Sequence, residues 1–420
     1  MIVEMGKRAR TAAKQLSGAA TSQKNQGLTW LADLLESSTD ALLAANQGDQ
    51  VAAQQAGLAP ALLERLTLNP PRLAGMAADL RNLADMPDPV GEIFDVSTLP
   101  NGLRVHKQRV PLGVMGVIYE SRPNVTVDVA GLAIKTGNAV ILRGGSETLQ
   151  SNAALVTLVR QALALAGLPV DAVQFIDDPD RARVMELLHL YEYLDLIIPR
   201  GGAALHQFCR ENSRIPVITG GIGICHLFVD ESADLEAALP VIRNAKVQRP
   251  TVCNALDTLL VHRAIAGQFL PRLIQTLATD GVSFRLDPSA LPYLPEAGKL
   301  TASLLPAGPD DFDTEWLSLV LGIKVVESLD TAIDHIQQHS TFHSDGILTA
   351  TEANASRFIA RVDSSAVYVN ASTRFTDGGQ LGLGAEVAIS TQRLHARGPM
   401  GLRELTTYKW VIQGDYHVRK

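Results

Sequence analysis

The sequence predicts an α/β fold with at least two domains, in which helices cover parallel β-sheets. At 420 residues the chain is too long for one ordinary hydrophobic core. Beyond about residue 110, short continuous apolar runs alternate with amphipathic stretches, as expected of parallel strands buried on both faces. Apolar residues make up 46% of the chain and charged residues 19%, a composition typical of a globular protein.

Residues 1 to about 90 are predicted to be helical. Leu28–Ala45 and Pro60–Leu68 place apolar residues three and four positions apart, which is the helical period. Pro70-Pro71 and Pro87-Asp88-Pro89 are expected to break these helices. Asn101-Gly102, between apolar residues, predicts the turn of a β-hairpin.

Strands and helices then alternate in two α/β stretches. The first has predicted strands at Gly113–Ile118, Ala139–Leu142, Val173–Ile176, Leu196–Ile198, Pro216–Ile218 and Cys225–Val229, and helices at Asn152–Ala166, Arg181–Leu190 and Ala203–Arg210. The second, from about 240 to 370, has predicted strands near Asp257–Val261, Ile323–Val326, Gly346–Thr349 and Ala366–Val369. Residues 372–401 are glycine-rich and predicted to be irregular, and the β-rich end, 405–412, is suited to pairing outside its own domain.

Composition and charge argue against several classes of protein. The net charge of −7 disfavours a nucleic-acid partner, which needs a clustered basic surface. No apolar run approaches the roughly 20 residues of a membrane helix, and the first residues do not resemble a secretion leader. Three scattered cysteines and ten histidines show neither a disulfide framework nor metal-ligand spacing. A cytoplasmic protein without a metal site is therefore expected.

Cys253 is the first candidate for a catalytic residue. It follows the proline-containing run Gln248–Thr251 and precedes an apolar strand, a place where a thiol can face a cleft. A thiolate is a good nucleophile toward activated carbonyl groups. A free cysteine is more often a small buried apolar residue. The pattern at Cys253 alone therefore leaves both interpretations open.

Three glycine pairs are candidate phosphate-binding turns. The dinucleotide-binding pattern G-x-G-x-x-G is absent, so an ordinary Rossmann site is not supported. The pairs stand in the runs Arg143-Gly144-Gly145-Ser146-Glu147, Arg200-Gly201-Gly202 and Thr219-Gly220-Gly221. Each can bring backbone amides or a helix start close to an anion, or can simply form a tight turn. Their presence in one α/β stretch favours a nucleotide.

Arg122 is a candidate for binding a substrate anion. It lies in Tyr119–Val125, just after a predicted strand, where open α/β sheets bind their ligands. A guanidinium group can hold a carboxylate or a phosphate through two hydrogen bonds. The alternative is an exposed ion pair.

Five runs together carry a family resemblance. They are Val110–Asn124, Lys135–Gly145, Pro199–Gly202, Thr251–Thr258 and Asp377–Leu402. In this order they resemble the aldehyde dehydrogenase superfamily, and within it the branch that reduces the acyl phosphate L-glutamate 5-phosphate. The resemblance covers about residues 95 to 415, whereas the helical first 90 residues add little signal.

The resemblance implies a domain organisation and a cofactor. It implies an NADP-binding domain over 1–240, whose 97–113 hairpin belongs to an oligomerisation arm, and a catalytic domain over 241–375. Residues 376–420 would form a return segment and the C-terminal oligomerisation strand. NADPH would be the cofactor, and the chain would form a homo-oligomer. Association with glutamate 5-kinase, which makes the labile substrate, is a question that the sequence leaves open.

The resemblance also implies roles for individual residues. Cys253 matches the nucleophile and Glu315 matches a glutamate that holds the nicotinamide ribose. The other expected cofactor-binding residues are Arg143, Gly144, Gly145 and Glu147 near the adenosine ribose, Arg200, Gly201 and Gly202 near the pyrophosphate, and Gly220 and Gly221. The expected substrate-binding residues are Arg122, Asn124 and Arg374, the last for the α-carboxylate of the substrate.

Two departures from the hydrolytic members of the superfamily favour an acyl phosphate over water. Ile218 stands where those enzymes keep a glutamate as general base, and Arg122, or Asn124 if the alignment shifts, stands at their oxyanion asparagine. The expected reaction is the reduction of L-glutamate 5-phosphate to L-glutamate 5-semialdehyde with NADPH, through a thioester on Cys253, in proline biosynthesis. The alternatives are a thioester-forming dehydrogenase for coenzyme A or another acyl phosphate, and a non-catalytic member of the superfamily.

Overall fold

The computed structural model describes residues 1–220, 222–294 and 303–419. The described chain divides into two compact units. The first contains residues 1–219, 382–388 and 399–420, and the second contains residues 220–381 and 389–398. The aldehyde dehydrogenase-like α/β architecture expected from the sequence is confirmed, with two parallel sheets, one three-stranded antiparallel sheet and a two-stranded sheet of β14 (Ile389–Ser390) and β15 (Gly398–Pro399).

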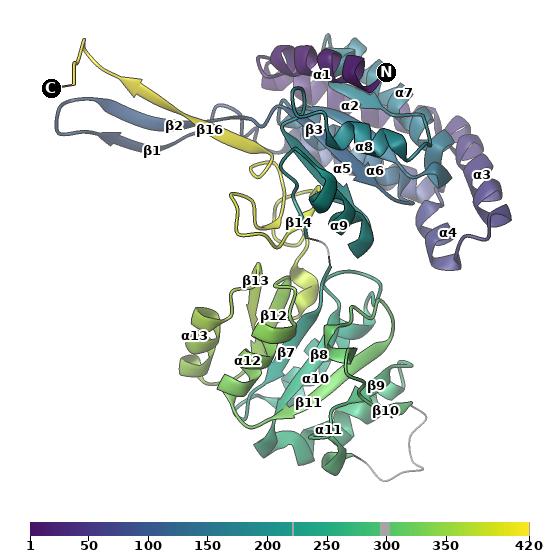
Figure 1. Cartoon of the computed structure of the whole chain (residues 1–420), viewed down its shortest axis with the longest axis vertical. Coiled ribbons are helices and arrows are strands. Elements are labelled where there is room, and N and C mark those ends of the chain that lie inside the picture. The colour runs from purple at the N-terminus through teal and green to yellow at the C-terminus, as the bar shows by residue number, and fades with distance from the viewer. Residues whose placement is uncertain (221, 295–302, 420) are drawn as a thin grey trace. The chain divides into compact units, whose positions relative to one another are not determined.

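The first unit begins with five helices (Figure 1). They are α1 (Ile2–Leu16), α2 (Thr21–Ser37), α3 (Thr39–Gln55), α4 (Pro60–Leu66) and α5 (Pro70–Asp85). The predicted helical stretch 28–45 is therefore interrupted at Ser38, between α2 and α3. Pro70 opens α5, where its missing N–H costs nothing, and the side chain of Asn69 caps the helix by accepting a hydrogen bond from the Arg72 amide at 2.9 Å.

A four-stranded parallel sheet forms the centre of the first unit. Its strand order is β5 (Val173–Phe175), β4 (Ala139–Gly144), β3 (Val114–Tyr119) and β6 (Leu196–Arg200). The connecting helices are α6 (Pro123–Lys135), α7 (Leu149–Leu165) and α8 (Ala182–Leu188), and α9 (Ala203–Asn212) follows β6. The chain runs from β3 to β4 and β5 on one side and returns to β6 on the other. At such a reversal, open α/β sheets bind their ligands outside the carboxyl ends of the strands, here β3 and β6.

An antiparallel sheet carries the predicted hairpin. Strands β1 (Ile93–Thr98) and β2 (Arg104–Pro111) form the hairpin, and its turn contains Gly102 with a φ of 90°. The C-terminal strand β16 (Thr406–Gln413) pairs antiparallel with β2 along its length. The predicted hairpin and its joining to the C-terminal strand are confirmed, while the role of this sheet in oligomerisation stays a prediction.

A seven-stranded parallel sheet forms the second unit. Its order is β10 (Leu304–Pro306), β9 (Ser283–Leu286), β11 (Val320–Val326), β8 (Leu256–His262), β7 (Cys225–Val229), β12 (Ser344–Leu348) and β13 (Ala366–Val369). Helices α10 (Leu235–Val247) and α11 (Arg263–Ala278) contribute to one apolar core, and α12 (Leu329–His339) and α13 (Glu352–Arg361) to another. The central strands β7 and β8 are buried almost throughout, because both cores cover them.

Three sequence-based assignments need correction. Strand β7 belongs to the seven-stranded sheet and not to the first one, because it pairs with β8 and β12. The predicted strand 216–218 reduces to one bridge between Ile197 and Val217. The expected boundary at residue 240 falls inside α10, whereas the compact units divide after Thr219. The predicted irregular segment 372–401 is confirmed apart from the short elements Thr373–Phe375, Ile389–Ser390 and Gly398–Pro399.

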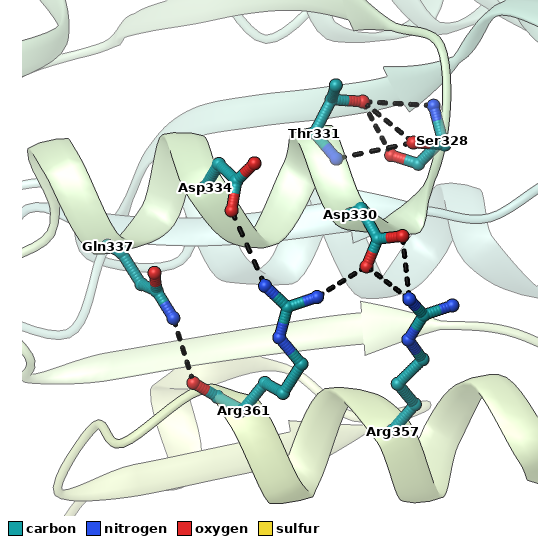
Figure 2. Close-up of polar contacts among 7 residues, drawn as sticks. All are labelled: Ser328, Asp330, Thr331, Asp334, Gln337, Arg357 and Arg361. Carbon is teal, nitrogen blue, oxygen red and sulfur yellow. Dashed lines mark hydrogen bonds and ion pairs between the residues drawn. The ribbon is translucent and has the colours of Figure 1, made fainter.

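Helix α12 shows how local polar contacts fix an element of the second unit (Figure 2). The side chain of Ser328 accepts a hydrogen bond from the Thr331 amide at 3.3 Å, and the Thr331 hydroxyl oxygen accepts one from the Ser328 amide at 3.0 Å. Asp330 in the first turn forms ion pairs with Arg357 and Arg361 of α13. The ion pairs are largely exposed and contribute little. The capping box should contribute most of the local stability.

Replacing Ser328 by Ala should therefore destabilise the start of α12 by about 1 kcal/mol. Amides in the first turn should then exchange with solvent roughly fivefold faster in hydrogen-exchange mass spectrometry. Asp334→Ala is the matched control, since it removes only an exposed contact to Arg361 at 3.5 Å. Equal effects of the two substitutions would contradict this account.

Candidate active site

Cys253 lies in an irregular segment, residues 248–255, between α10 and β8. The segment turns tightly, since the Ala255 amide donates to the Val252 carbonyl at 3.0 Å. Cys253 is partly exposed, whereas the residues from Asn254 through Val261 are buried. The thiol thus stands at the amino end of a central strand with access to solvent. The other two cysteines, Cys209 and Cys225, are buried, and burial raises the pKa of both thiols, that of Cys209 to about 12. Neither is suited to act as a nucleophile.

The backbone of Gly223 lies directly against that of Cys253. A β-carbon on Gly223 would overlap with the Cys253 carbonyl group, so this position requires glycine. The Gly223 amide donates to the Glu315 carboxylate at 2.9 Å, and the thiol of Cys225 donates to the Cys253 carbonyl at 3.2 Å. Gly223 therefore connects Glu315, an expected cofactor-binding residue, with Cys253, the expected catalytic residue.

Asn254 attaches the segment that carries Cys253, residues 248–255, to the turn at residues 372–376. Its side-chain amide donates to the Thr376 carbonyl at 2.9 Å, and its own carbonyl accepts from the Thr373 hydroxyl at 2.7 Å. The Arg374 guanidinium donates to the Asn254 side-chain oxygen. This role of Asn254 was not predicted from the sequence, because a buried amide between a helix and a strand is recognisable only when its partners are known.

Arg374 contacts both ends of the segment that carries Cys253. Its Nε donates to the side chain of Gln248 at 3.1 Å, and its Nη1 donates to Asn254. Burial, followed by the positive charge of Arg249, lowers the pKa of Arg374, and Cys253 and Asp377 act in the opposite direction. The structure therefore brings together Cys253, Glu315 and Arg374 in the second unit.

A buried ion pair underlies this site and was not anticipated. Lys246 and Asp257 are almost completely buried, and their charged atoms lie 3.5 Å apart. Asp257 also accepts a hydrogen bond from the Trp316 amide at 3.2 Å, next to Glu315 in the sequence. Burial raises the pKa of Asp257 to about 6 and lowers that of Lys246, while each partner's charge opposes the other's shift. The only signal in the sequence was an acidic residue inside an otherwise apolar strand.

In the first unit, Arg143 and the residues after it lie at the carboxyl end of β4. Arg143 is buried, and its guanidinium donates to the carbonyls of Gly144 and Pro179 at 2.8 and 2.9 Å. Its Nε has no hydrogen-bond partner among the described residues. Burial lowers the pKa of Arg143, an effect that the Glu147 charge opposes. Arg143 is thus held mainly by the backbone.

Glu147 connects the turn after β4 to the segment after β3. One oxygen of its carboxylate accepts hydrogen bonds from both the amide and the hydroxyl of Ser121 at 2.7 Å. Ser121 has a φ of 37°, a strained value for a residue with a side chain. Side chains at Gly144 or Gly145 would overlap with Asn152 or with Glu147 itself. Close packing therefore already accounts for these two glycines.

The second glycine pair lies where β6 meets α9. The Gly202 amide donates to the Glu120 carboxylate at 3.2 Å, and a β-carbon on Gly201 would overlap with that carboxylate. A negative charge thus stands at the amino end of α9, where the helix dipole favours an anion. Arg200 precedes this turn, and its buried Nε has no hydrogen-bond partner within the described chain.

The predicted substrate-binding residues of the first unit lie at the start of α6. Arg122 is the residue before the helix and is partly exposed, and Asn124 in the first turn is exposed. Asn124 donates a hydrogen bond to Asp128 at 2.9 Å. Burial raises the pKa of Asp128 to about 6, and the hydrogen bond from Asn124 opposes this. Both predicted residues lie near the carboxyl end of β3.

The remaining predicted positions follow β6. Ile218 is buried, and its amide donates to the Ile197 carbonyl at 3.0 Å. Its apolar side chain supplies no carboxylate at this position. A β-carbon on Gly220 would overlap with the Ile389 carbonyl, which explains the need for glycine there. Gly221 lies outside the described residues. The described residues contain no group of His, Cys, Asp and Glu able to hold a metal, and no helix among them is long and apolar enough to cross a membrane.

The first unit has features suited to a nucleotide. The unpartnered Nε–H groups of Arg143 and Arg200 and the first amides of α9 are donors at the carboxyl ends of β4 and β6. These are the groups that phosphates require, at the edge where open α/β sheets bind nucleotides. The residues present therefore fit an anionic dinucleotide. The described part of the second unit contains the thiol, the carboxylate of Glu315 and the guanidinium of Arg374.

Comparison with known proteins places the chain in a family. The sequence model of the aldehyde dehydrogenase family matches residues 2–290. The chain is 59% identical over 418 residues to the gamma-glutamyl phosphate reductase of Roseiflexus castenholzii, covering 99% of both proteins. It is 57% identical to that of Yersinia enterocolitica, covering 100% of this chain and 99% of the relative.

Solved structures agree with this assignment. The crystal structure of gamma-glutamyl phosphate reductase from Thermotoga maritima is 48% identical and matches the whole of both chains with a TM-score of 0.95. An engineered glycolyl-CoA reductase with bound NADP⁺, 18% identical over 98% of this chain and 96% of that one, shares the fold with a TM-score of 0.69. The chain therefore belongs to the aldehyde dehydrogenase family, within its group of gamma-glutamyl phosphate reductases, and is an oxidoreductase.

Proposed function

We propose that the protein reduces L-glutamate 5-phosphate to L-glutamate 5-semialdehyde with NADPH, releasing inorganic phosphate, as a step of proline biosynthesis in the cytoplasm. The observation that carries this proposal is the identity of 57–59% over almost the whole chain to relatives named gamma-glutamyl phosphate reductase. The partly exposed thiol of Cys253, held in a fixed backbone turn, supports the proposed chemistry.

Cys253 is the proposed nucleophile. Its thiolate attacks the acyl carbon of the substrate, a sulfur–carbon bond forms, and the bond to the phosphate oxygen breaks with release of phosphate. The thioester is then reduced to a thiohemiacetal, and collapse of this adduct releases the aldehyde and regenerates the thiolate. Backbone amides near Cys253 would stabilise the oxyanion, and one such donor contributes about 3–4 kcal/mol.

NADPH, when bound, supplies the hydride for this reduction. The residues proposed to hold it would do so through backbone amides, guanidinium groups or carboxylates. They are Arg143, Gly144, Gly145, Glu147, Arg200, Gly201, Gly202, Gly220, Gly221 and Glu315. Glu315 is supported by its connection through Gly223 to Cys253. The proposed substrate-binding residues are Arg122, Asn124 and Arg374.

The antiparallel sheet β1–β2–β16 is the proposed contact between copies in a homo-oligomer. Strands β1 and β16 are its two edges, and exposed apolar side chains follow both of them, including Ile93, Val96, Trp410 and Ile412. Edges with exposed apolar residues are suited to pairing with another chain. Association with glutamate 5-kinase stays open as a further partnership.

Replacing Cys253 by Ala should abolish turnover without unfolding the protein. The thiol forms the covalent bond and is partly exposed, so the core does not depend on it. The activity should fall below about one per cent of wild type, while NADPH binding measured by calorimetry is retained. Cys209→Ala is the control, because that buried thiol is expected to serve packing alone. Substantial turnover of Cys253→Ala would contradict the thioester mechanism.

Arg143→Gln should weaken NADPH binding much more than NADH binding, because we propose that this guanidinium meets the 2′-phosphate of the cofactor. The measurement is the Kd of each cofactor. Arg200→Gln is the comparison, since Arg200 is the other arginine at this edge of the sheet. Equal losses for both cofactors would show that Arg143 serves the fold through the carbonyls of Gly144 and Pro179.

In the reverse direction, oxidation of glutamate semialdehyde should require phosphate or arsenate. With Ile218 at the position of the hydrolytic base, no carboxylate there can activate water against the thioester. General-base catalysis is worth roughly 10²–10⁴-fold, so the rate without phosphate should be lower by about that factor. The measurement is NADPH formation in phosphate-free buffer. A rate close to that with phosphate would contradict the assignment of an acyl phosphate substrate.

A further inference from the structure

Arg249 is a cation without a counter-charge in the segment that carries the nucleophile. It lies four positions before Cys253, is exposed, and makes no hydrogen bond or ion pair with any described residue. The other arginine near the end of α10, Arg243, is bound through two 2.7 Å contacts to Asp280. The guanidinium group of Arg249 is therefore available to a ligand.

A second guanidinium group, that of Arg374, is held against the same short segment. Arg374 donates to Gln248, the neighbour of Arg249 in the sequence, and to Asn254, the neighbour of Cys253. These contacts fix Arg374 on the same short segment. The two positive charges oppose each other, and Cys253 is close enough to Arg374 for its charge to act on it. The nearby carboxylate, Asp377, is exposed and accepts hydrogen bonds from the amides of Gly379 and Gln380.

Two guanidinium groups close together are unfavourable unless an anion lies between them. A phosphate dianion is a suitable anion, because guanidinium groups bind its oxygens through paired, charge-assisted hydrogen bonds. In the proposed reaction such a group departs from the carbon that Cys253 attacks. Because the phosphate is bonded to that carbon, its binding site must lie close to the thiol.

We infer that Arg249 and Arg374 form the binding site for the phosphate group of the acyl phosphate substrate, beside Cys253. This inference rests on the proposed function. It assigns Arg374 to the phosphate, whereas the family resemblance led us to expect the α-carboxylate at Arg374 and the phosphate at Arg122. Arg374 is held by Gln248 and Asn254, whereas the exposed guanidinium group of Arg249 is available to the phosphate.

The test uses the reverse reaction of the full-length enzyme, with inorganic phosphate as the varied substrate. Arg249→Gln should raise the KM for phosphate about 10- to 100-fold, the range expected for losing one hydrogen-bonded charge. The KM for NADP should not change. Arg243→Gln is the matched control, since it removes an arginine of α10 that is paired elsewhere, and its KM for phosphate should equal that of wild type.

A second measurement needs no cofactor. Inorganic phosphate should slow alkylation of Cys253 by iodoacetamide in wild type and in Arg243→Gln, and Arg249→Gln should need about 10- to 100-fold more phosphate for the same protection. Unchanged phosphate dependence of Arg249→Gln in both assays would overturn the inference. The inference would also be overturned if Arg249→Gln changed only the pH dependence of alkylation, because Arg249 would then act on the thiol and not on phosphate. A wild-type enzyme that is indifferent to phosphate would instead overturn the proposed function.

Discussion

The position of Cys253, the proposed nucleophile, depends on one close approach between backbones. Gly223 leads into β7 and Cys253 leads into β8, and these strands are neighbours in the centre of the second sheet. Any side chain on Gly223 would displace the carbonyl group of Cys253. The same glycine uses its amide to hold Glu315. Thus one residue without a side chain fixes both the thiol and the carboxylate expected to meet the cofactor.

Buried polar pairs tie each of these two strands to a neighbouring element. Lys246 and Asp257 connect α10, β8 and the backbone next to Glu315, while Asp345 on β12 accepts hydrogen bonds from the backbone and ring of His226 on β7. Removing one member of a buried pair leaves an uncompensated charge and typically costs about 3–5 kcal/mol.

Sequence patterns predicted the elements well where the local signal determines the structure. The Asn101-Gly102 turn and the alternating strands and helices depend on short-range geometry, and the structure contains them. The sheet to which β7 belongs could not be predicted from its own residues, because any buried apolar strand suits either sheet. It is decided by pairing with β8 and β12, which lie further along the chain. The strand predicted at residues 216–218 also depends on pairing, and only one bridge forms there, between Ile197 and Val217.

The candidate site was predictable in its chemical groups but not in its contacts. The family resemblance identified Cys253, Glu315 and Arg374, and the structure places all three around one segment. Sequence alone did not reveal that Asn254 and Gln248 hold Arg374, because hydrogen bonds between residues more than a hundred positions apart leave no periodic signal. It also gave no sign that Arg249 lacks a partner.

The chemistry of arginine explains why this residue type suits position 374. The guanidinium donates from Nε toward Gln248 and from Nη1 toward Asn254, two directions separated by its rigid planar fork. The ammonium group of a lysine, at the end of a flexible side chain, could not make both contacts from one fixed position. Because arginine keeps its charge even where burial lowers its pKa, the segment gains a permanent cation next to Cys253. The fold therefore uses one side chain both to shape the segment that carries Cys253 and to place a positive charge beside it.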